Sequence, residues 1–579
     1  MKKVFTLLLA FFSLNAMAQS MSPDEETQGM ECTTITVGKK ASKDGSVMTS
    51  HTDDSHRTRT NVWVEPARDY AKGDMQKMYL RRWAPKVEGK MPKYDNIEIG
   101  EIPQAEHTYQ FLNTAYPCMN EKQLAIGEST IGGRKELQSD SGLVDCQRLC
   151  MLLLQRCSTA RQAIRTAGEL LKEYGWNDAG ECLTIADKNE VWIMEVMAKI
   201  PQYENGVNIN KGAVWVAKRI PDGYISAHAN QARITTIDFN DKENCLYSED
   251  VIDEARKAGI FSGSDEEFSF CDVYAPLDFG GARGCEARVW AFFNRYADGM
   301  DAYVDYAMGY DLKNHMPLYV KPNRQLSVKD LADMMRDHYE GTPMDMTQDI
   351  GAGGSHLPYR WRPMGFEYEG KRYVNERAIA TQQTGWWFVS QSRKWLPDEI
   401  GGRYWFGVDD AATSPLMPFY CCATGVPYCV REGVGSMLEY SRQSMFWAVN
   451  RIAQFAYLRY DEIGAEVRNV IDKYENHQIQ YLDSLEQEVL SVKKKQQRVA
   501  HLTQYGVNNA MKLFRRWKDL DEYLMVKYID GNIKRQNADG SFQDNGHNKR
   551  IPASPIQKPY SEKWIESVVN DHGQVLMER

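Results

Sequence analysis

The chain changes character at Glu31-Cys32-Thr33-Thr34-Ile35-Thr36-Val37-Gly38-Lys39-Lys40, where a polar segment ends and the first strand-like run begins. A cut between Glu31 and Cys32 would place a thiol and a free α-amine on one residue. A free α-amine has a pKa of roughly 7.7–8.0, so near pH 7 it can accept the thiol proton. Such a pair is the minimum that covalent acyl transfer needs. The alternative is that Cys32 is a buried or disulfide-bonded structural cysteine.

Residues 1–18 have the pattern of a secretory signal peptide. Two lysines precede an apolar run over residues 4–14, and Ala16-Met17-Ala18 supplies a small-x-small cleavage site. The apolar run is too short to be a permanent membrane anchor. We therefore expect a secreted or periplasmic protein without a stable membrane span. Residues 19–31 are polar, without an apolar period, and are predicted to be a propeptide.

Composition narrows the function classes. The chain has 579 residues and a net charge of −9, which gives no electrostatic reason to expect nucleic acid as a partner. It contains 12 cysteines, of which eleven remain if Cys32 is the nucleophile. Their pairing cannot be deduced from sequence, and no metal-ligand spacing is complete, so we interpret these eleven as structural.

A β-hairpin is predicted at the start of the folded part. Thr33 to Val37 forms one strand, Lys43-Asp44-Gly45-Ser46 the turn, and Val47 to Thr52 the returning strand. This hairpin would carry Cys32 at one end and Asp54 near the other.

The remaining pattern predicts an α+β layered fold. Strand-like runs are expected at 123–128, 182–197 (with a turn at Lys188-Asn189), 213–230, 378–390 and 403–408. Helices are expected at 143–174 (one or two), 251–258 and 286–296. From 436 to 528 the pattern is helical, with an apolar face at Ile479, Leu482, Leu485, Val489 and Val492. We divide the chain into a catalytic domain at 32–435, a helical extension at 436–530 and a polar tail at 531–579.

The run Cys-Thr-Thr-Ile-x-Val-Gly-Lys-Lys-Ala-Ser-x-Asp-Gly-Ser, followed by Thr-x-Asp-Ser, resembles the start of mature C69 dipeptidases, a family of N-terminal nucleophile hydrolases. The resemblance extends from Cys32 to about Tyr420. It implies an αββα sandwich, self-cleavage at Glu31-Cys32, dipeptides or short peptides as substrates, and no metal or organic cofactor.

The family's Arg-x-x-Asp motif is matched by His51-Thr52-Asp53-Asp54, with histidine in place of arginine. The resemblance gives Asp54 the role of orienting the α-amine of Cys32. His51 would contact substrate, although histidine is shorter than arginine and not always charged. Without this context, the two aspartates would be ordinary turn residues.

Two further catalytic candidates come from the resemblance. Asn230, in Ser226-Ala227-His228-Ala229-Asn230-Gln231, matches an Asn-Gln that follows a strand, and its amide could donate to an oxyanion. Arg288, in Glu286-Ala287-Arg288-Val289-Trp290, matches an arginine near the nucleophile that could lower the thiol pKa or bind a carboxylate. The alternatives are a turn asparagine and a helix-surface arginine.

Asn120, Ser129 and Thr130 are substrate-binding candidates, because Asn120-Glu121-Lys122 and Leu124-Ala125-Ile126-Gly127-Glu128-Ser129-Thr130 resemble the family's second signature. An ordinary strand end is the alternative.

Three functions remain open on sequence. The first is an exported cysteine dipeptidase, and the second is an amidase acting on non-peptide acyl amides. The third is a non-catalytic exported binding protein, which is favoured only by His51 in place of arginine. A homo-oligomer is compatible with the helical face.

Overall fold

The computed structural model describes residues 31–55, 61–88, 91–361, 364–435 and 439–579, together with the side chains of these residues outside 80–96. The predicted signal peptide and all of the predicted propeptide except Glu31 lie outside the described residues.

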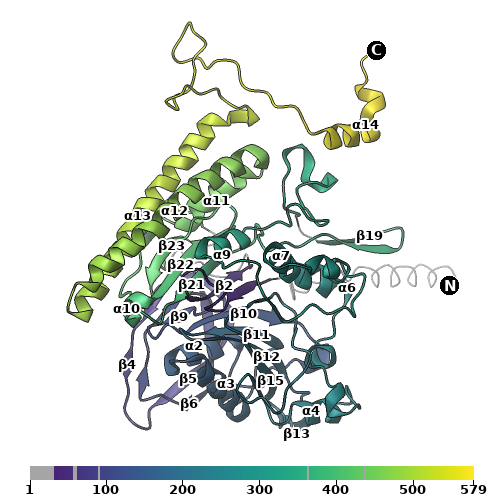
Figure 1. The fold of residues 1–579 in the computed structure, drawn as a ribbon, viewed down its shortest axis with the longest axis vertical. Coiled ribbons are helices and arrows are strands. Elements are labelled where there is room, and N and C mark those ends of the chain that lie inside the picture. The colour runs from purple at the N-terminus through teal and green to yellow at the C-terminus, as the bar shows by residue number, and fades with distance from the viewer. Residues whose placement is uncertain (1–30, 56–60, 89–90, 362–363, 436–438) are drawn as a thin grey trace, which may run out of the picture.

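Two antiparallel sheets form the centre of the molecule (Figure 1). The first contains, in spatial order, β18 (Tyr319–Val320), β16 (Ile225–His228), β1 (Thr34–Val37), β2 (Val47–Asp53), β21 (Trp386–Ser392), β22 (Gly402–Val408) and β23 (Met417–Tyr420). The second contains β17 (Cys245–Tyr247), β15 (Ala213–Ile220), β12 (Val191–Ala198), β11 (Gly180–Ala186), β10 (Ala125–Ile131), β9 (Met119–Asn120), β8 (Phe111–Asn113) and β3 (Trp63–Glu65). Four two-stranded ribbons pair β4 (Arg68–Asp69) with β7 (His107–Thr108), β5 (Met75–Glu88) with β6 (Met91–Pro103), β13 (Tyr203–Glu204) with β14 (Val207–Asn208), and β19 (Gly365–Tyr368) with β20 (Lys371–Val374).

The predicted hairpin is confirmed, since β1 pairs with β2 through Thr36 opposite Thr49 and Val37 opposite Met48. Every residue of both strands is buried, because one face meets the second sheet and the other meets helices. Gly127 of β10 allows the two sheets to approach, since a Cβ there would lie 2.7 Å from the Ser50 carbonyl oxygen. The close approach brings β10 against β1 and β2, the two strands that follow Cys32.

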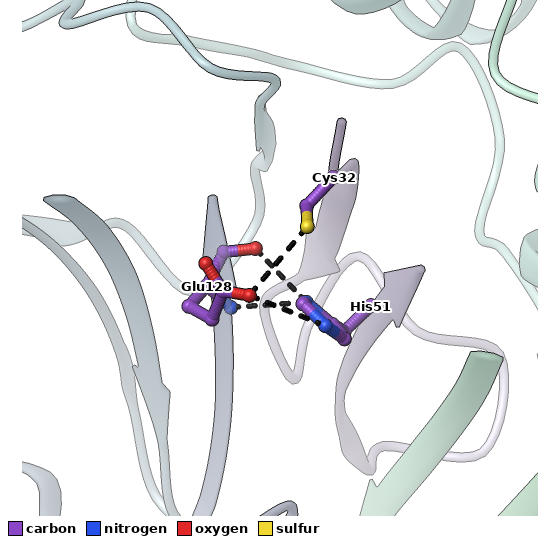
Figure 2. Close-up of side chains that lie close together, drawn as sticks. All are labelled: Cys32, His51 and Glu128. Atoms are coloured by element: carbon purple, nitrogen blue, oxygen red, sulfur yellow. Dashed lines mark hydrogen bonds and ion pairs between the residues drawn. The ribbon is translucent and has the colours of Figure 1, made fainter. Parts of the chain in front are cut away.

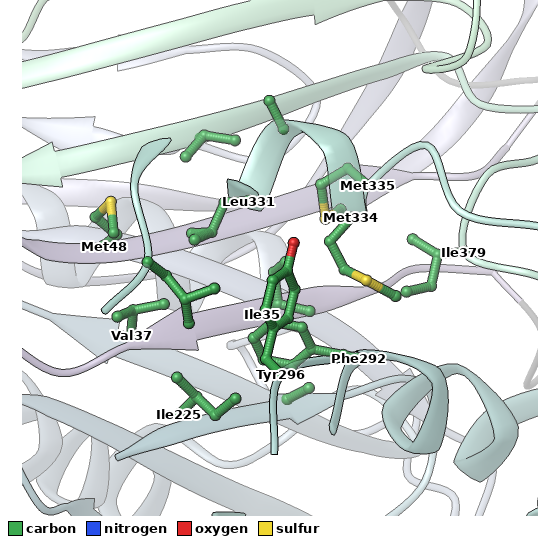
Figure 3. Close-up of a cluster of buried hydrophobic side chains, with 14 of the residues drawn as sticks. Ile35, Val37, Met48, Ile225, Phe292, Tyr296, Leu331, Met334, Met335 and Ile379 are labelled. Atoms are coloured by element: carbon green, nitrogen blue, oxygen red, sulfur yellow. The ribbon is translucent and has the colours of Figure 1, made fainter. Parts of the chain in front are cut away.

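Helices cover the outer faces of both sheets. Helices α7 (Ala287–Tyr296) and α9 (Val328–Met334) pack on the first sheet through a buried cluster that includes Ile35, Phe292 and Leu331 (Figure 3). On the second sheet lie α2 (Cys146–Arg156) and α3 (Ala160–Tyr174), the two helices into which the predicted 143–174 segment divides. The result is a helix–sheet–sheet–helix arrangement, which confirms the predicted α+β class.

Smaller helices occupy the connections. They are η1 (Lys135–Leu137), α4 (Val251–Lys257), η2 (Asp265–Glu267), α5 (Phe270–Tyr274), α6 (Phe279–Gly281), η3 (Ala282–Glu286), η4 (Met300–Tyr303), α8 (Val304–Ala307), η5 (Ile350–Ser355), α10 (Asp398–Gly401) and η6 (Tyr428–Val430). The strand predicted at 378–390 was placed too early, because β21 begins only at Trp386. The preceding residues form a turn whose Gln383 and Thr384 donate hydrogen bonds to Asp54.

The C-terminal part is helical, as its sequence pattern predicts. It contains α11 (Met445–Ala456), η7 (Tyr460–Gly464), α12 (Ala465–Leu490), α13 (Lys495–Lys527) and η8 (Ile529–Gly531). The predicted apolar face packs on the first sheet, where Leu482, Leu485 and Val489 are buried. A further helix, α14 (Glu562–Leu576), lies in the segment predicted to be a polar tail. In the described part of the chain, no helix has the length and apolar character needed to span a membrane.

Candidate active site

Cys32 is buried directly before β1, with 4% of its surface exposed. Its thiol lies 3.5 Å from Oε1 of Glu128, a residue of β10 on the other sheet (Figure 2). Burial raises the pKa of the Cys32 thiol well above its ordinary value, and the nearby carboxylate of Glu128 raises it further. With the Glu31–Cys32 bond intact, the thiol is therefore protonated at neutral pH, so it needs a base before it can act as a nucleophile.

Arg288 holds the backbone of Cys32. Its side chain is fully buried, and Nη1 donates to the Cys32 carbonyl at 2.7 Å and to Oγ1 of Thr33 at 2.8 Å. Nη2 donates to Oδ1 of Asn230 at 2.9 Å. The helix-surface alternative for Arg288 is thus wrong, because the inward face of α7 directs this guanidinium at the candidate nucleophile.

Asn230 lies at the end of β16 in a left-handed conformation, with φ of 62°. Its Nδ2 donates to the carbonyl of Thr130 at 2.9 Å, and its backbone N–H donates to the Ser129 hydroxyl at 3.1 Å. An amide NH₂ has two hydrogens, so one donor of Nδ2 remains beyond the bond to Thr130. Asn230 and Thr130 are therefore brought together beside Arg288.

Ser129 supports this loop. Its hydroxyl lies 2.6 Å from Nδ1 of His228, and it accepts the Asn230 backbone N–H. Burial keeps the pKa of His228 well below its ordinary value, so the ring is neutral and can accept the Ser129 proton. Ser129 is fully buried, and its contacts orient Asn230.

His51 lies on β2 against Glu128, inside the cluster of Figure 2. Nδ1 of His51 lies 2.9 Å from the Glu128 carbonyl, and Nε2 lies 3.5 Å from Oε1 of Glu128. Burial lowers the pKa of His51 to about 3, so the imidazole is neutral and does not replace the charge of the family's arginine. Burial raises the pKa of Glu128 to about 7, within the range of a general base at neutral pH.

A cation is nevertheless supplied to Asp54 by Arg377, which follows β20. Nη2 of Arg377 donates to Oδ2 of Asp54 at 2.5 Å and also to the carbonyl oxygen of Glu31. Asp54 accepts a hydrogen bond from Thr52, whose hydroxyl oxygen accepts the backbone N–H of Thr33 at 3.0 Å. Asp54 is thereby connected to the backbone beside Cys32.

A cavity of about 500 Å³ opens next to this junction. It is lined by polar and acidic residues that include Glu31, Thr130, Gln138, Asp140, Asp178 and Tyr203. Burial raises the pKa of Asp178 to about 6, with a smaller effect from nearby Asp145. The volume of the cavity lies within the range of small-molecule sites.

Asn120 is held by backbone groups. Its Nδ2 donates to the carbonyls of Leu154 and Cys157, both at 2.8 Å, and its Oδ1 accepts from the N–H groups of Lys122 and Leu124. All the amide's hydrogens and both acceptor positions are used, so Asn120 fastens the end of α2 to the turn before β10.

The twelve cysteines all lie within the described residues, where each is buried and none forms a disulfide. Cys118, for example, accepts a hydrogen bond from the Tyr404 hydroxyl at 3.0 Å. They form part of the hydrophobic packing, as expected of structural cysteines.

A buried thiol, two guanidinium groups and a carboxylate thus meet around the backbone of residues 31–33, an arrangement compatible with acyl transfer. The model of the family described as "Peptidase family C69" matches residues 31–473. The chain belongs to this family.

Curated relatives agree with the family assignment. The chain is 26% identical to a probable dipeptidase of Latilactobacillus sakei over 69% of this chain and 76% of the relative. It is 24% identical to dipeptidase A of Lactobacillus helveticus, over 86% of this chain and 98% of the relative. It is also similar to probable dipeptidase B of Streptococcus pyogenes serotype M1, with 22% identity over 85% of this chain and 92% of the relative.

Sequence reasoning missed two residues of the site. Glu128 stands inside the second signature, and its carboxylate between apolar strand residues was a usable signal. Arg377 follows a surface ribbon in no recognised motif, and nothing in the sequence indicated that it would meet Asp54.

Proposed function

We propose that the chain is an exported cysteine dipeptidase with an N-terminal nucleophile hydrolase fold, made active by self-cleavage at Glu31–Cys32. The observation that carries the proposal is the Glu31–Cys32 peptide bond itself. Its carbonyl oxygen accepts from Arg377, and the next carbonyl accepts from Arg288. The family membership, the dipeptidase names of the relatives and the four-layered arrangement support the same function.

Self-cleavage requires a base other than the α-amine, since that nitrogen is still an amide. Glu128, 3.5 Å from the thiol, takes this role. Its carboxylate accepts the thiol proton while Sγ attacks the Glu31 carbonyl carbon, and Arg377 stabilises the oxyanion. The C–N bond then breaks, and the Cys32 nitrogen takes up a proton to become an amine. Water hydrolyses the thioester, which leaves a Glu31 carboxylate and a free Cys32 thiol.

Turnover repeats this chemistry on a substrate. The new α-amine of Cys32 accepts the thiol proton, Sγ attacks the substrate carbonyl, and the proton passes to the leaving amine. Asp54, fixed by Arg377, orients the α-amine through the contacts beside Thr33. The second hydrogen of the Asn230 amide is the oxyanion donor, and Arg288 fixes Asn230 by binding its Oδ1.

The acidic surroundings favour dipeptides over the non-peptide acyl amides of the alternative amidase. A dipeptide carries its α-ammonium one carbon from the scissile carbonyl, so this charge lies close to the nucleophile. Glu128 beside Cys32, with Asp140 and Asp178 in the cavity, offers carboxylates for that ammonium. An apolar acyl group would leave them unpaired.

The experiment that tests the proposal is the intact mass and N-terminal sequence of purified wild type and Cys32→Ala, followed by a dipeptide panel. We expect wild type to begin at Cys32, and Cys32→Ala to retain the segment before it and to lose hydrolysis at least 10³-fold. Cys245→Ala, a buried cysteine of β17, is the matched control and should be processed normally.

An active wild type that keeps residue 31 attached would contradict the role of the α-amine. An unprocessed and inactive wild type would favour the binding-protein alternative. Hydrolysis of acyl amides with no turnover of dipeptides would favour the amidase.

A further inference from the structure

Three different metal-binding side chains meet at the candidate nucleophile. Sγ of Cys32, Nε2 of His51 and a carboxylate oxygen of Glu128 all lie within 4.8 Å of one another (Figure 2). The distance from Sγ to Oε1 is 3.5 Å, and that from Nε2 to Oε1 is also 3.5 Å. Cys32, His51 and Glu128 are 4%, 1% and 1% exposed. The donors come from three separate strands or strand ends and converge only in the folded protein.

Two polar atoms of this cluster are unsatisfied. Among the described residues, Nε2 of His51 and Oε2 of Glu128 are buried without a hydrogen-bond partner. Buried polar atoms are normally paired, so the unpaired Nε2 of His51, which lies 3.5 Å from Oε1 of Glu128, points to a ligand in this cluster. Nδ1 of His51 lies 2.9 Å from the Glu128 carbonyl oxygen and 3.2 Å from the Glu128 backbone nitrogen, so the backbone of Glu128 fixes the orientation of the ring, as in metal-ligating histidines. The imidazole is neutral, and when Nδ1 carries its proton, the lone pair of Nε2 is directed into the cluster.

The spacing fits a tetrahedral Zn²⁺ ion. With Zn–S of about 2.3 Å and Zn–N and Zn–O of about 2.0 Å, the edges of a tetrahedron are about 3.5 Å for S···O and about 3.3 Å for N···O. The observed 3.5 Å for S···O and 3.5 Å for N···O lie close to these lengths, and the sulfur and Nε2 lie within 4.8 Å of each other. Thiolate, imidazole and carboxylate are all common zinc ligands, whereas Mg²⁺ and Ca²⁺ favour sets made only of oxygen.

We propose that Cys32, His51 and Glu128 form an inhibitory site for Zn²⁺, in which the ion binds the sulfur of the candidate nucleophile. On binding, the Cys32 thiol loses its proton to solvent and the thiolate sulfur forms a bond to zinc. Because the sulfur lone pair is then engaged and the cluster is filled, substrate and metal compete for the same enzyme. The histidine that replaces the family's arginine is the residue that creates this site, since arginine does not ligate metals.

A neighbouring cluster supplies the discriminating control. Ligand atoms of Glu128, Cys146 and Glu181 also lie within 4.8 Å of one another. An ion bound there would use the sulfur of Cys146 rather than that of Cys32. Cys32→Ala and Cys146→Ala therefore separate the two positions, and His51→Gln tests the first alone.

The test is titration of the purified full chain with Co²⁺, a spectroscopic substitute for Zn²⁺. We expect one equivalent to give a sulfur-to-cobalt charge-transfer band that added Zn²⁺ abolishes. The band should be absent in Cys32→Ala, weakened at least tenfold in affinity in His51→Gln, and retained in Cys146→Ala. Circular dichroism of each variant verifies folding. Zn²⁺ should raise the apparent KM for dipeptides, and a chelator should reverse the effect.

No band in wild type, or a band that persists in Cys32→Ala, would overturn the proposal. A band lost in Cys146→Ala alone would place the ion in the other cluster and overturn it as well. The readout does not need activity: a protein that binds Co²⁺ through Cys32 but hydrolyses no dipeptide would leave this site standing and disprove the proposed function.

Discussion

Two buried glutamates of this protein have opposite environments. Glu486 of α12 binds Arg393 in a bidentate pair at 2.7 and 2.8 Å, and it also accepts from Arg403 at 2.8 Å and from the Tyr420 hydroxyl at 2.7 Å. Glu128 of β10 has a thiol and a neutral imidazole beside it, and one of its oxygens has no hydrogen-bond partner among the described residues.

The ionisation of the two carboxyls differs accordingly. Burial alone raises a carboxyl pKa, yet at Glu486 the hydrogen bonds and charges of Arg393 and Arg403 lower it below the ordinary value. At Glu128 the hydrogen bonds with Glu181 and Cys32 offset burial only in part, and the pKa rises to about 7. The paired glutamate fastens α12 to the first sheet, whereas the uncompensated one is available for proton transfer. The presence or absence of a paired cation therefore distinguishes a glutamate with a structural role from one that can transfer protons.

Glu128→Gln gives the largest expected effect, because it removes the base of self-cleavage. Processing at Glu31–Cys32 should slow by 10²- to 10⁴-fold, roughly the range for general base catalysis. In wild type, the processing rate should rise with pH up to about 7 and then level off, since the carboxylate is the active form. Time courses of the intact mass between pH 5 and 9 measure both. Processing at the wild-type rate in the variant would exclude Glu128 as the base.

Glu486→Gln is the matched change at the paired glutamate. It leaves Arg393 and Arg403 buried with less compensation, so the unfolding free energy should fall by roughly 3–5 kcal/mol. Processing of the molecules that do fold should be unchanged, because α12 contributes no group to the site. Denaturant unfolding followed by circular dichroism measures the loss. An unchanged midpoint would show that the pair does not hold α12 in place.

Arg377→Met tests the cation supplied to Asp54. The expected loss in the rate of self-cleavage is 10²- to 10³-fold, about the value of one oxyanion donor. Arg377→Lys keeps the charge without the two-pronged donor geometry and should recover only part of the rate. Intact mass again reports processing, and melting curves of both variants control for the unpaired Asp54. Full activity in Arg377→Met would assign this residue to stability alone.

The smallest expected effect is on the pH dependence of stability. The pKa of Glu128 is raised from 4.5 in the unfolded chain to about 7 in the folded protein, so its contribution to stability is full below 4.5 and is lost as the pH rises to 7. Glu128→Gln should therefore match wild type near pH 4 and be more stable by roughly 1–3 kcal/mol above pH 7. Urea unfolding of Cys32→Ala with and without Glu128→Gln, so that neither protein is processed, measures the difference. A larger gap at pH 4 than at pH 8 would contradict the sign.

Local sequence patterns were sufficient to predict the strands and helices around the candidate site. The alternation around Val37 and Val47 predicted the β1–β2 hairpin, and the helical spacing up to Tyr174 predicted α2 and α3. The resemblance selected Cys32, Asn230 and Arg288 from short sequence signatures, and the structure brings the three together, while their catalytic roles stay predictions. Asn120 was selected by the same reasoning, but its amide is used by the backbone, and sequence does not reveal such saturation.

The sequence by itself determined the α+β class, the family and the residue that stands at the candidate cleavage point. Only the tertiary structure decided which charges surround that residue. Arg377 reaches Asp54 from 323 positions away, and Glu128 meets Cys32 from 96 positions away across two sheets. Periodicity and propensity depend on neighbours within a few residues, whereas burial and charge pairing depend on which surfaces meet when the sheets close.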